Sequence, residues 1–310
     1  MPAFLSHYIL AQRILRKIPE EYEVVYKNAF FWGATGPDFF YGHRLLPWQY
    51  RKSLSEISHI IHDSPPEKIL DYLYSYSVEK EDRELRDYAF GFVTHYAFDS
   101  VAHPYVLYRA NRGAEEEIID IPLITDIKKS SIYHNRMEAC LDSVFLKKET
   151  GMSVGQIRLE VTCPNDGKCI RKIAGAMDSY IRDSGIWPGA DPEEIERAVY
   201  DWRRCIILLN DRYHLKKYAL SYGEKILGFP QLVSFFFRSS NVEPGADYAN
   251  FRRREWISPA DGSVHRETFF ELADRAEEKA LALIRKLHET GHLSYKDCKE
   301  SFSGNPLSLS

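Results

Sequence analysis

Apolar side chains recur every three to four residues along most of this chain, which is the spacing of helices that bury one face. The pattern predicts helices over residues 4–15, 54–61, 66–76, 85–103, 131–148, 170–181, 192–221, 223–237 and 268–288. Glycine and proline interrupt it over 28–50, 104–130 and 241–265, where we expect loops, with one long helix ending at Pro104. Because no set of strands stands out, the predicted fold class is all-α, a multi-helix bundle.

One domain is expected over residues 1–300, because a chain of 310 residues with an apolar fraction of 44% can bury a large core. The candidate chemistry described below falls within residues 1–145. The helices of residues 150–300 are expected to complete the core. Residues 301–310 are expected to form a disordered tail, as chain ends commonly do.

Composition argues against several classes of protein. The net charge of -4 and the absence of a long basic run give no support for nucleic-acid binding. Five cysteines without a closely spaced pair indicate neither a disulfide framework nor a thiolate zinc site. No stretch approaches the roughly 18 apolar residues of a membrane span. The start lacks the features of a secretory signal, so we expect a cytoplasmic protein.

Three side chains of the predicted helix 85–103 stand one turn apart: His95, Asp99 and His103. Residues four apart lie on one face of a helix and can reach a common metal ion. The surrounding positions are apolar on nearly every side, which predicts a buried helix. Burying imidazole and carboxylate groups without a partner is costly, and zinc accepts both as ligands. The pattern therefore favours a metal site over a solvated polar face.

A second pair, His134 and Glu138, repeats the four-residue spacing on the predicted helix 131–148. Alone, such a pair is common on solvated helices, but beside the first motif it indicates further metal ligands. Asp38 stands among glycines and aromatics and has two interpretations. It could hold a backbone amide in a turn, or it could face a metal ion or a water nucleophile, and the residues alone barely separate the two.

Histidines are concentrated in the first half of the chain, so we expect the chemistry there. Seven of the eleven lie at or before position 134: His7, His43, His59, His62, His95, His103 and His134. His7 lies on the apolar face of the first predicted helix, where a histidine is more often a core residue than a ligand. His59 and His62 stand three apart and could approach one site.

Taken in order, these residues resemble the zinc-dependent phospholipase C family of bacteria. The resemblance rests on an early histidine, an aspartate after a proline, a His-x3-Asp helix with a following histidine, and a later His-x3-Glu: His7, Asp38, His95, Asp99, His103, His134 and Glu138. One more histidine is expected between the aspartate and the His-x3-Asp helix. His62 matches it best, with His59 as the alternative. The match covers roughly residues 1–145, and its specificity lies in the ordered set.

The resemblance implies an all-α fold with zinc ions in a cleft. It implies one ion held by Asp38, His62, His95 and Asp99, a second by His103, His134 and Glu138, and a third by His7 and a bridging Asp99. Asp38 would also orient or deprotonate the attacking water. Secreted members complete the third site with an N-terminal tryptophan, whereas this chain starts with Met-Pro, so two or three zinc ions are expected. His103 follows Asp99 more closely than in those enzymes, so it could instead join the ion of His95.

Clustered zinc suits phosphoester hydrolysis, because zinc lowers the pKa of a water from about 15.7 to near 7 and paired ions stabilise the attacking and leaving oxygens. The main hypothesis is a zinc-dependent phosphodiester hydrolase resembling phospholipase C, with a phospholipid as one candidate substrate. Aromatic residues between positions 30 and 50 could line a lipid or choline site, although packing beneath Asp38 is favoured because aromatics commonly fill cores. The sequence sets no oligomeric state.

Three alternatives stay open. A zinc-dependent single-strand nuclease would use the same type of site, but the acidic net charge counts against it. The dipeptide His62-Asp63 suggests an HD-type phosphohydrolase, which would leave the His95–His103 series and the His134–Glu138 pair without a role. Lastly, the protein could keep zinc only to stabilise its helices.

Overall fold

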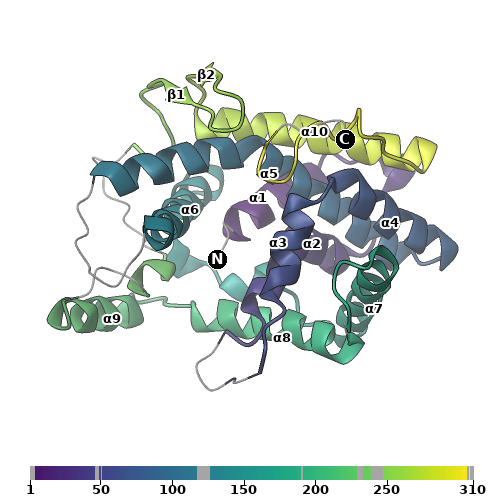
Figure 1. The fold of residues 1–310 in the computed structure, drawn as a ribbon, viewed down its shortest axis with the longest axis horizontal. Coiled ribbons are helices and arrows are strands. Elements are labelled where there is room, and N and C mark those ends of the chain that lie inside the picture. Colours follow the sequence, from purple (N-terminus) through teal and green to yellow (C-terminus); the bar gives the residue numbers. More distant parts are fainter. Residues whose placement is uncertain are drawn as a thin grey trace.

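The structure is a computed structural model that describes residues 4–45, 49, 51–116, 126–189, 191–228, 233–238, 247–305 and 307. Within these ranges the helices are α1 (Phe4–Leu15), α2 (Lys27–Thr35), α3 (Ser55–Asp63), α4 (Pro66–Glu79), α5 (Arg83–Glu116), α6 (Asp126–Thr150), α7 (Gly167–Ser184), α8 (Pro192–Leu208), α9 (Leu215–Ile226) and α10 (Phe269–Thr290) (Figure 1). Short 3₁₀ helices are η1 (Glu20–Tyr22), η2 (Gly36–Gly42), η3 (Val154–Gln156), η4 (Leu159–Thr162) and η5 (Ser234–Phe236).

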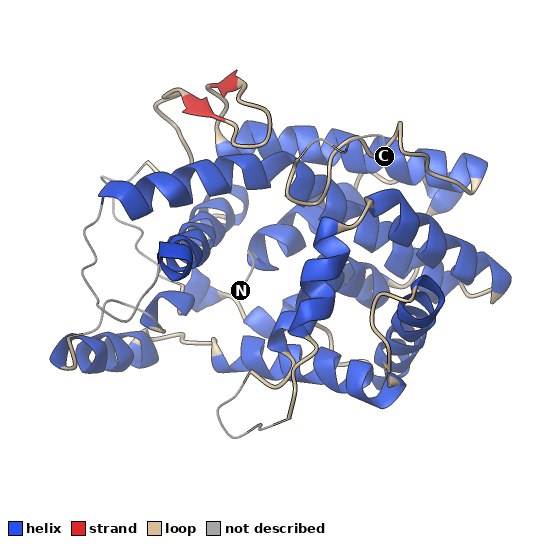
Figure 2. Cartoon of the chain, viewed as in Figure 1, coloured by secondary structure: helices blue, strands red, loops and turns tan. Residues whose placement is uncertain are grey.

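The all-α class is confirmed. Among the described residues, the strands are limited to one small antiparallel hairpin that pairs β1 (Trp256–Ile257) with β2 (Val264–His265), shown in red in Figure 2. No helix in the described ranges has the length and apolar composition that crossing a membrane requires.

Helix α5 is the central helix of the core. It contacts α1, α2, α4, α6 and α10, and α10 runs beside it along the top of Figure 1. The side chains of Phe90, Phe92, Val93 and Tyr96 are fully buried, as an apolar surface all round the helix predicts. The position of α5 therefore places His95 inside the protein.

The prediction that this helix ends at Pro104 is wrong, because α5 continues to Glu116. Proline removes one backbone donor and crowds the carbonyl of the residue four before it, here Ser100. Gly304 packs closely here: a Cβ added to it would lie 2.5 Å from Cγ of Pro104 and 2.8 Å from the Ser100 oxygen. Tertiary packing thus outweighs the local preference. The predicted loop 104–130 is helical over 104–116 and 126–130, and 117–125 lie outside the described residues.

The loop predicted over residues 28–50 is also largely wrong, because α2 and η2 occupy most of its described part. Gly33 and Gly91 let the backbones of α2 and α5 approach closely. A Cβ added to Gly33 would lie 2.1 Å from the Tyr88 oxygen, and one added to Gly91 would lie 2.0 Å from the Phe30 oxygen. The glycine that suggested a helix break is instead a packing position.

We expect Gly91→Ala to lower the free energy of unfolding by about 3 kcal/mol, because the new methyl meets backbone that cannot rotate away. Gly175→Ala on α7 is the matched control, since a Cβ at Gly175 has open space around it. Urea denaturation compares the two variants. A Gly91→Ala protein as stable as the parent would show that α2 and α5 can separate without cost.

The predicted helix 192–221 divides into α8 and α9. His214 adopts a φ of 58°, and the carboxylate of Asp211 accepts hydrogen bonds from the backbone N–H groups of Lys216 and Lys217 at the start of α9. The helix predicted over 223–237 is wrong beyond Ile226, where η5 is the next described element and residues 229–232 lie outside the described ranges.

The disordered tail predicted from residue 301 is wrong for residues 301–305. Phe302 is fully buried and packs edge-on against Tyr96 and His62, with ring centroids 5.2 Å apart in both pairs. Residues 306 and 308–310 lie outside the described residues. One large side chain therefore ties the end of the chain to the histidines of the core.

Candidate metal centre

All eight residues predicted as metal ligands converge in the interior. They come from α1, η2, α3, α5 and α6, which are separated by up to 131 positions in the chain between His7 and Glu138. Their ligand atoms form three groups in which the atoms lie within 4.8 Å of one another: His7, His95 and Asp99; Asp38, His62 and His95; and His103, His134 and Glu138. His95 belongs to the first two groups, and His103 of the third lies 3.7 Å from Asp99 of the first, so the three groups adjoin.

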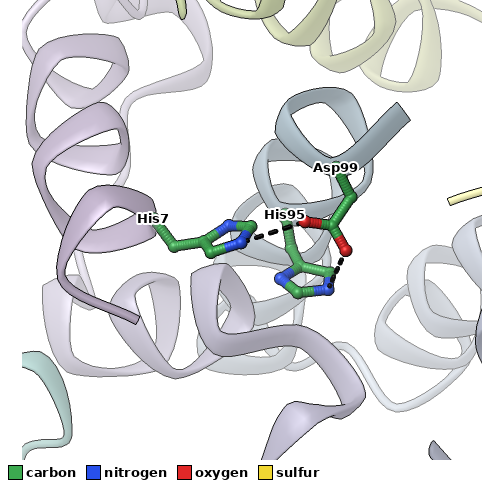
Figure 3. Close-up of side chains that lie close together, drawn as sticks. All are labelled: His7, His95 and Asp99. Atoms are coloured by element: carbon green, nitrogen blue, oxygen red, sulfur yellow. Dashed lines mark ion pairs between the residues drawn. The ribbon is translucent and has the colours of Figure 1, made fainter. Parts of the chain in front are cut away.

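The first group joins α1 to α5. Figure 3 shows the ring of His7 reaching across to Asp99. His7 Nε2 lies 3.0 Å from Asp99 Oδ1, and His95 Nε2 lies 3.3 Å from Asp99 Oδ2. The rings of His7 and His95 stack with centroids 4.5 Å apart. Asp99 therefore faces His7 with Oδ1 and His95 with Oδ2, and Oδ2 also lies 3.4 Å from His62 Nε2.

The position of His7 depends on an anchor at the start of α1. Asp142 Oδ1 on α6 accepts hydrogen bonds of 2.7 Å from both the backbone N–H and the hydroxyl of Ser6. The other oxygen of Asp142 accepts a 2.9 Å hydrogen bond from Nε of Arg238. All of these side chains are buried, so the end of α1 next to the metal centre is firmly held.

In the second group, backbone carbonyls fix the orientation of two histidines. His62 Nδ1 donates to the Ser58 oxygen at 2.7 Å, and His95 Nδ1 donates to the Ala34 oxygen at 3.3 Å. Their Nε2 atoms then face each other at 3.4 Å. When both rings are neutral, two lone pairs oppose one another, an arrangement that a shared cation would relieve. Holding the remote ring nitrogen in this way is characteristic of metal-ligating histidines.

Asp38 completes this group from η2. Its side chain is buried, His62 Nε2 lies 3.4 Å from Oδ1, and neither oxygen has a hydrogen-bond partner among the described residues. A buried carboxylate without donors is costly unless a cation is close. The alternative of a turn aspartate that caps a backbone amide is therefore not supported.

The third group lies where α5 meets α6. Glu138 Oε1 lies 3.1 Å from His134 Nε2 and 3.6 Å from His103 Nε2. His103 Nδ1 lies 3.3 Å from the Phe302 carbonyl and 3.7 Å from Asp99. Nδ1 of His103 is thus oriented by the Phe302 carbonyl, and Nε2 points toward Glu138. This orientation favours His103 as a ligand in the third group over a site that it would share with His95. Glu138 Oε2 is buried without a partner among the described residues.

The pKa shifts show how strongly the cluster favours positive charge. Burial would raise the pKa of Asp99, but the imidazoles of His103 and His95 outweigh it and hold the pKa well below its usual range. Burial would likewise raise the pKa of Glu138, yet its two histidine neighbours bring it below the ordinary value. Both carboxylates are therefore ionised in the interior and need protons on nearby imidazoles, or a metal, as counter-charge.

The histidines respond in opposite ways. Burial lowers the pKa of His95. Burial also acts to lower the pKa of His103, but Asp99 and Glu138 raise it to about 10. Burial raises the pKa of Asp38. Zinc accepts imidazole nitrogens and carboxylate oxygens as ligands. Buried carboxylate oxygens without a hydrogen-bond partner among the described residues occur in the second group, on Asp38, and in the third, on Glu138. The donor set fits zinc.

Zinc binding to the third group is expected to release a proton. The folded pKa of His103, about 10, is above the ordinary value of 6.5. Protonated His103 thus stabilises the metal-free fold fully below pH 6.5, and this contribution is lost as the pH rises to 10. Zinc must displace that proton, so its affinity should rise about tenfold per pH unit across this window.

Calorimetry in buffers of different ionisation enthalpy counts the protons released per zinc. His103→Gln should abolish the release from this group. Zinc affinity that stays constant between pH 6.5 and pH 10 would contradict the assignment of His103.

Gly36 shapes the second group. Its φ is 60°, and an added Cβ would lie 2.2 Å from Cδ2 of His95. We expect Gly36→Ala to displace the His95 ring and to lower zinc affinity about 10- to 100-fold, the cost of disturbing the support of a ligand. Gly262→Ala has the same backbone strain with open space around the new methyl, and it should leave zinc affinity unchanged. Equal affinities for the two variants would contradict this role.

His59, the alternative to His62, lies outside the three groups. Its Nδ1 lies 3.3 Å from the hydroxyl of Tyr41. The sequence could not reveal the carbonyls of Ser58, Ala34 and Phe302 that orient the histidines, because a backbone contact leaves no side-chain signature. It also missed Asp142 as the anchor of α1.

A cleft of about 990 Å³ opens onto the second and third groups. Its walls include Asp38, His62, His103, His134, Glu138, Tyr41, Leu107, Leu208, Leu209, Phe236 and Phe237. The candidate ligands thus form one part of the wall, and the rest combines apolar side chains with polar ones such as His43, Ser55 and Asn135. Of the aromatics before residue 50, Phe30, Trp32, Phe39 and Phe40 are fully buried, so the favoured interpretation as core packing is confirmed for these four.

Comparison with known proteins identifies the family. The model of the family described as zinc-dependent phospholipase C matches residues 6–184, more than half of the chain. No curated protein and no solved structure matches significantly. The matched segment contains all eight converging side chains. The chain therefore belongs to the zinc-dependent phospholipase C family of hydrolases.

Proposed function

We propose that this protein hydrolyses a phosphodiester with zinc ions held by the three groups of the metal centre. The observation that carries the proposal is the convergence of three adjoining ligand groups, of which the second and third line one cleft. Asp38, His62, His95 and Asp99 would hold one ion, and His103, His134 and Glu138 a second. His7 with Asp99 would hold a third, which gives two or three ions in all.

When bound, zinc supplies Lewis-acid stabilisation of phosphoryl charge and lowers the pKa of water. Asp38 is the candidate catalytic residue of the chain itself. Its side chain lines the cleft, and both of its oxygens lack hydrogen-bond partners among the described residues. A carboxylate in this position can orient a water molecule and accept its proton.

The wall of the cleft favours a lipid phosphodiester over a nucleic acid. Leu107, Leu208, Phe236 and Phe237 are apolar, which suits a substrate that carries hydrocarbon next to its phosphate. Among the described lining residues, Arg44 is the one arginine or lysine, and its guanidinium pairs with Glu194. A strand of nucleic acid would need a continuous basic path.

The test is to load purified protein with zinc, measure zinc per chain, and assay bis(p-nitrophenyl) phosphate and a panel of phospholipids. We expect two or three zinc ions per chain, together with release of p-nitrophenol and of a phosphomonoester from lipid. Full zinc loading without turnover of any phosphodiester would leave a structural role for the metal and would end this proposal.

A further inference from the structure

Helix α9 presents its apolar side to solvent. Its apolar residues recur at positions i, i+3, i+7 and i+11, the spacing of one helix face. They are among its most exposed side chains: Leu215 is 68% exposed, Tyr218 70%, Tyr222 67% and Ile226 67%. All twelve residues of α9 are described, and none of them is buried. Tyr213 and Leu227, which flank the helix, are exposed to the same degree.

The polar side of α9 is the one that holds it to the protein. Glu224 accepts hydrogen bonds from the backbone N–H groups of Val233 and Ser234 and from the hydroxyl of Ser234. Asp211 caps the start of the helix through the backbone N–H groups of Lys216 and Lys217. A surface helix normally buries its apolar stripe and exposes its polar face. Here the arrangement is inverted, so the outer face is fitted to an apolar environment.

The charged residues between positions 211 and 228 indicate which apolar environment this face contacts. Both acidic residues, Asp211 and Glu224, accept hydrogen bonds from backbone N–H groups. Of the four basic residues between positions 211 and 228, Arg212, Lys216 and Lys225 are exposed and Lys217 is half-buried. Apolar and tyrosine side chains bordered by lysine and arginine match the interface of a bilayer that contains anionic lipid.

The same segment is continuous with the cleft. Leu208 and Leu209, which precede α9, line the cleft that opens on the metal centre. Val233 also lines it, and its backbone N–H donates a hydrogen bond to Glu224 of α9. Figure 1 shows α9 at the lower left edge of the molecule, beyond the end of α8. A bilayer seated on the exposed face would therefore lie next to the apolar wall of the cleft.

We propose that α9 docks this protein on the surface of an anionic phospholipid bilayer, with the side chains of Leu215, Tyr218, Tyr222 and Ile226 entering the interface. The inference rests on the proposed function and deepens it, because it names the bilayer as the source of the phosphodiester and α9 as the contact. The helix lies on the membrane and does not cross it.

The experiment uses co-sedimentation of the full chain with vesicles of phosphatidylcholine, alone or with about one-third phosphatidylserine. The test variant is Tyr218→Ser/Ile226→Ser. The matched control is Val25→Ser/Val264→Ser, which removes two exposed apolar side chains elsewhere on the surface. We expect the parent and the control to bind the anionic vesicles. The affinity of the test variant for these vesicles should be at least about tenfold lower. Turnover of bis(p-nitrophenyl) phosphate should be the same in all three.

Several results would overturn the proposal: no binding of the parent to anionic vesicles, equal loss in both double variants, or a parent dimer that the test variant converts to monomer. A large fall in thermal stability of the test variant alone would also do so, because it would mean that the chain itself covers this face. The proposed function has a separate readout. If no phosphodiester is hydrolysed while vesicle binding behaves as expected, the catalytic proposal fails and the docking surface stands.

Discussion

The variant Asp99→Asn is expected to lose zinc from the centre, because it removes the one carboxylate that four histidines approach. Turnover should fall about a thousandfold or more, because bound zinc supplies several kcal/mol of transition-state stabilisation. The side chain of Asp99 lies within 3.0–3.7 Å of nitrogens of His7, His62, His95 and His103. In metal-free protein the same change removes the carboxylate 3.0 Å from His7 and leaves His103 with Glu138 alone as counter-charge. We therefore also expect it to destabilise the metal-free fold by roughly 3–5 kcal/mol near neutral pH.

The pH dependence of this variant follows from the lowered pKa of Asp99. A carboxylate with a lowered folded pKa stabilises the protein above its unfolded value of 3.8, and this contribution is lost as the pH falls through the folded pKa. The stability gap between parent and Asp99→Asn should thus close under strongly acidic conditions. Chemical denaturation across the pH range measures it.

Asp63→Asn is the control, since Asp63 is exposed beside His62 and is the residue that an HD-type site would require. If Asp63→Asn lost zinc while Asp99→Asn kept it, the assignment of the centre would be wrong and the HD alternative would return.

The variant Asp38→Asn should separate catalysis from structure. Burial raises the pKa of Asp38, and its oxygens lack partners among the described residues, so the neutral amide removes an unfavourable buried charge from the metal-free protein. We expect the melting temperature of the metal-free protein to stay the same or rise. Turnover should fall about 10²–10⁴-fold, the usual contribution of a general base.

The readouts for Asp38→Asn are calorimetric melting and initial rates on bis(p-nitrophenyl) phosphate at saturating zinc. Glu56→Gln on the exposed part of α3 serves as the control for removal of a carboxylate. Unchanged turnover in Asp38→Asn would show that Asp38 does not take part in the reaction.

The spacing of polar residues on helices proved the most informative feature of the sequence. His95, Asp99 and His103 lie on one face of α5 because four residues make about one turn, and the apolar surroundings predicted their burial. The pair His134 and Glu138 follows the same rule on α6. The convergence of these helices could be anticipated only through the resemblance to a family, because spacing within one helix does not place it against another.

The predicted helix boundaries were wrong where tertiary contacts oppose the local conformational preference of a residue. Pro104 lies within α5, and Gly33 serves the contact between α2 and α5. Both residues disfavour helix locally, and neither reveals in sequence the partner that compensates. Phe302 was missed for the same reason, because its burial depends on rings that lie about 200 positions earlier in the chain.

Helix α9 illustrates a different limit. The sequence predicted helices over 192–221 and 223–237, whereas one helix spans the boundary between them, over Leu215–Ile226. Periodicity alone suggests that its apolar stripe faces the core. Only the structure places Glu224 toward the protein and the stripe toward solvent. The pattern of polar and apolar residues defines the two faces of a helix, but it does not show which face contacts the protein and which contacts solvent.

Eight side chains from five elements are expected to share zinc ions. Anomalous X-ray diffraction at the zinc absorption edge, from crystals of zinc-loaded protein, would locate these ions. We expect two or three anomalous peaks, each about 2 Å from imidazole nitrogens or carboxylate oxygens of the three groups. Absence of a peak between His62 and His95, or peaks at surface histidines alone, would show that these side chains do not share zinc.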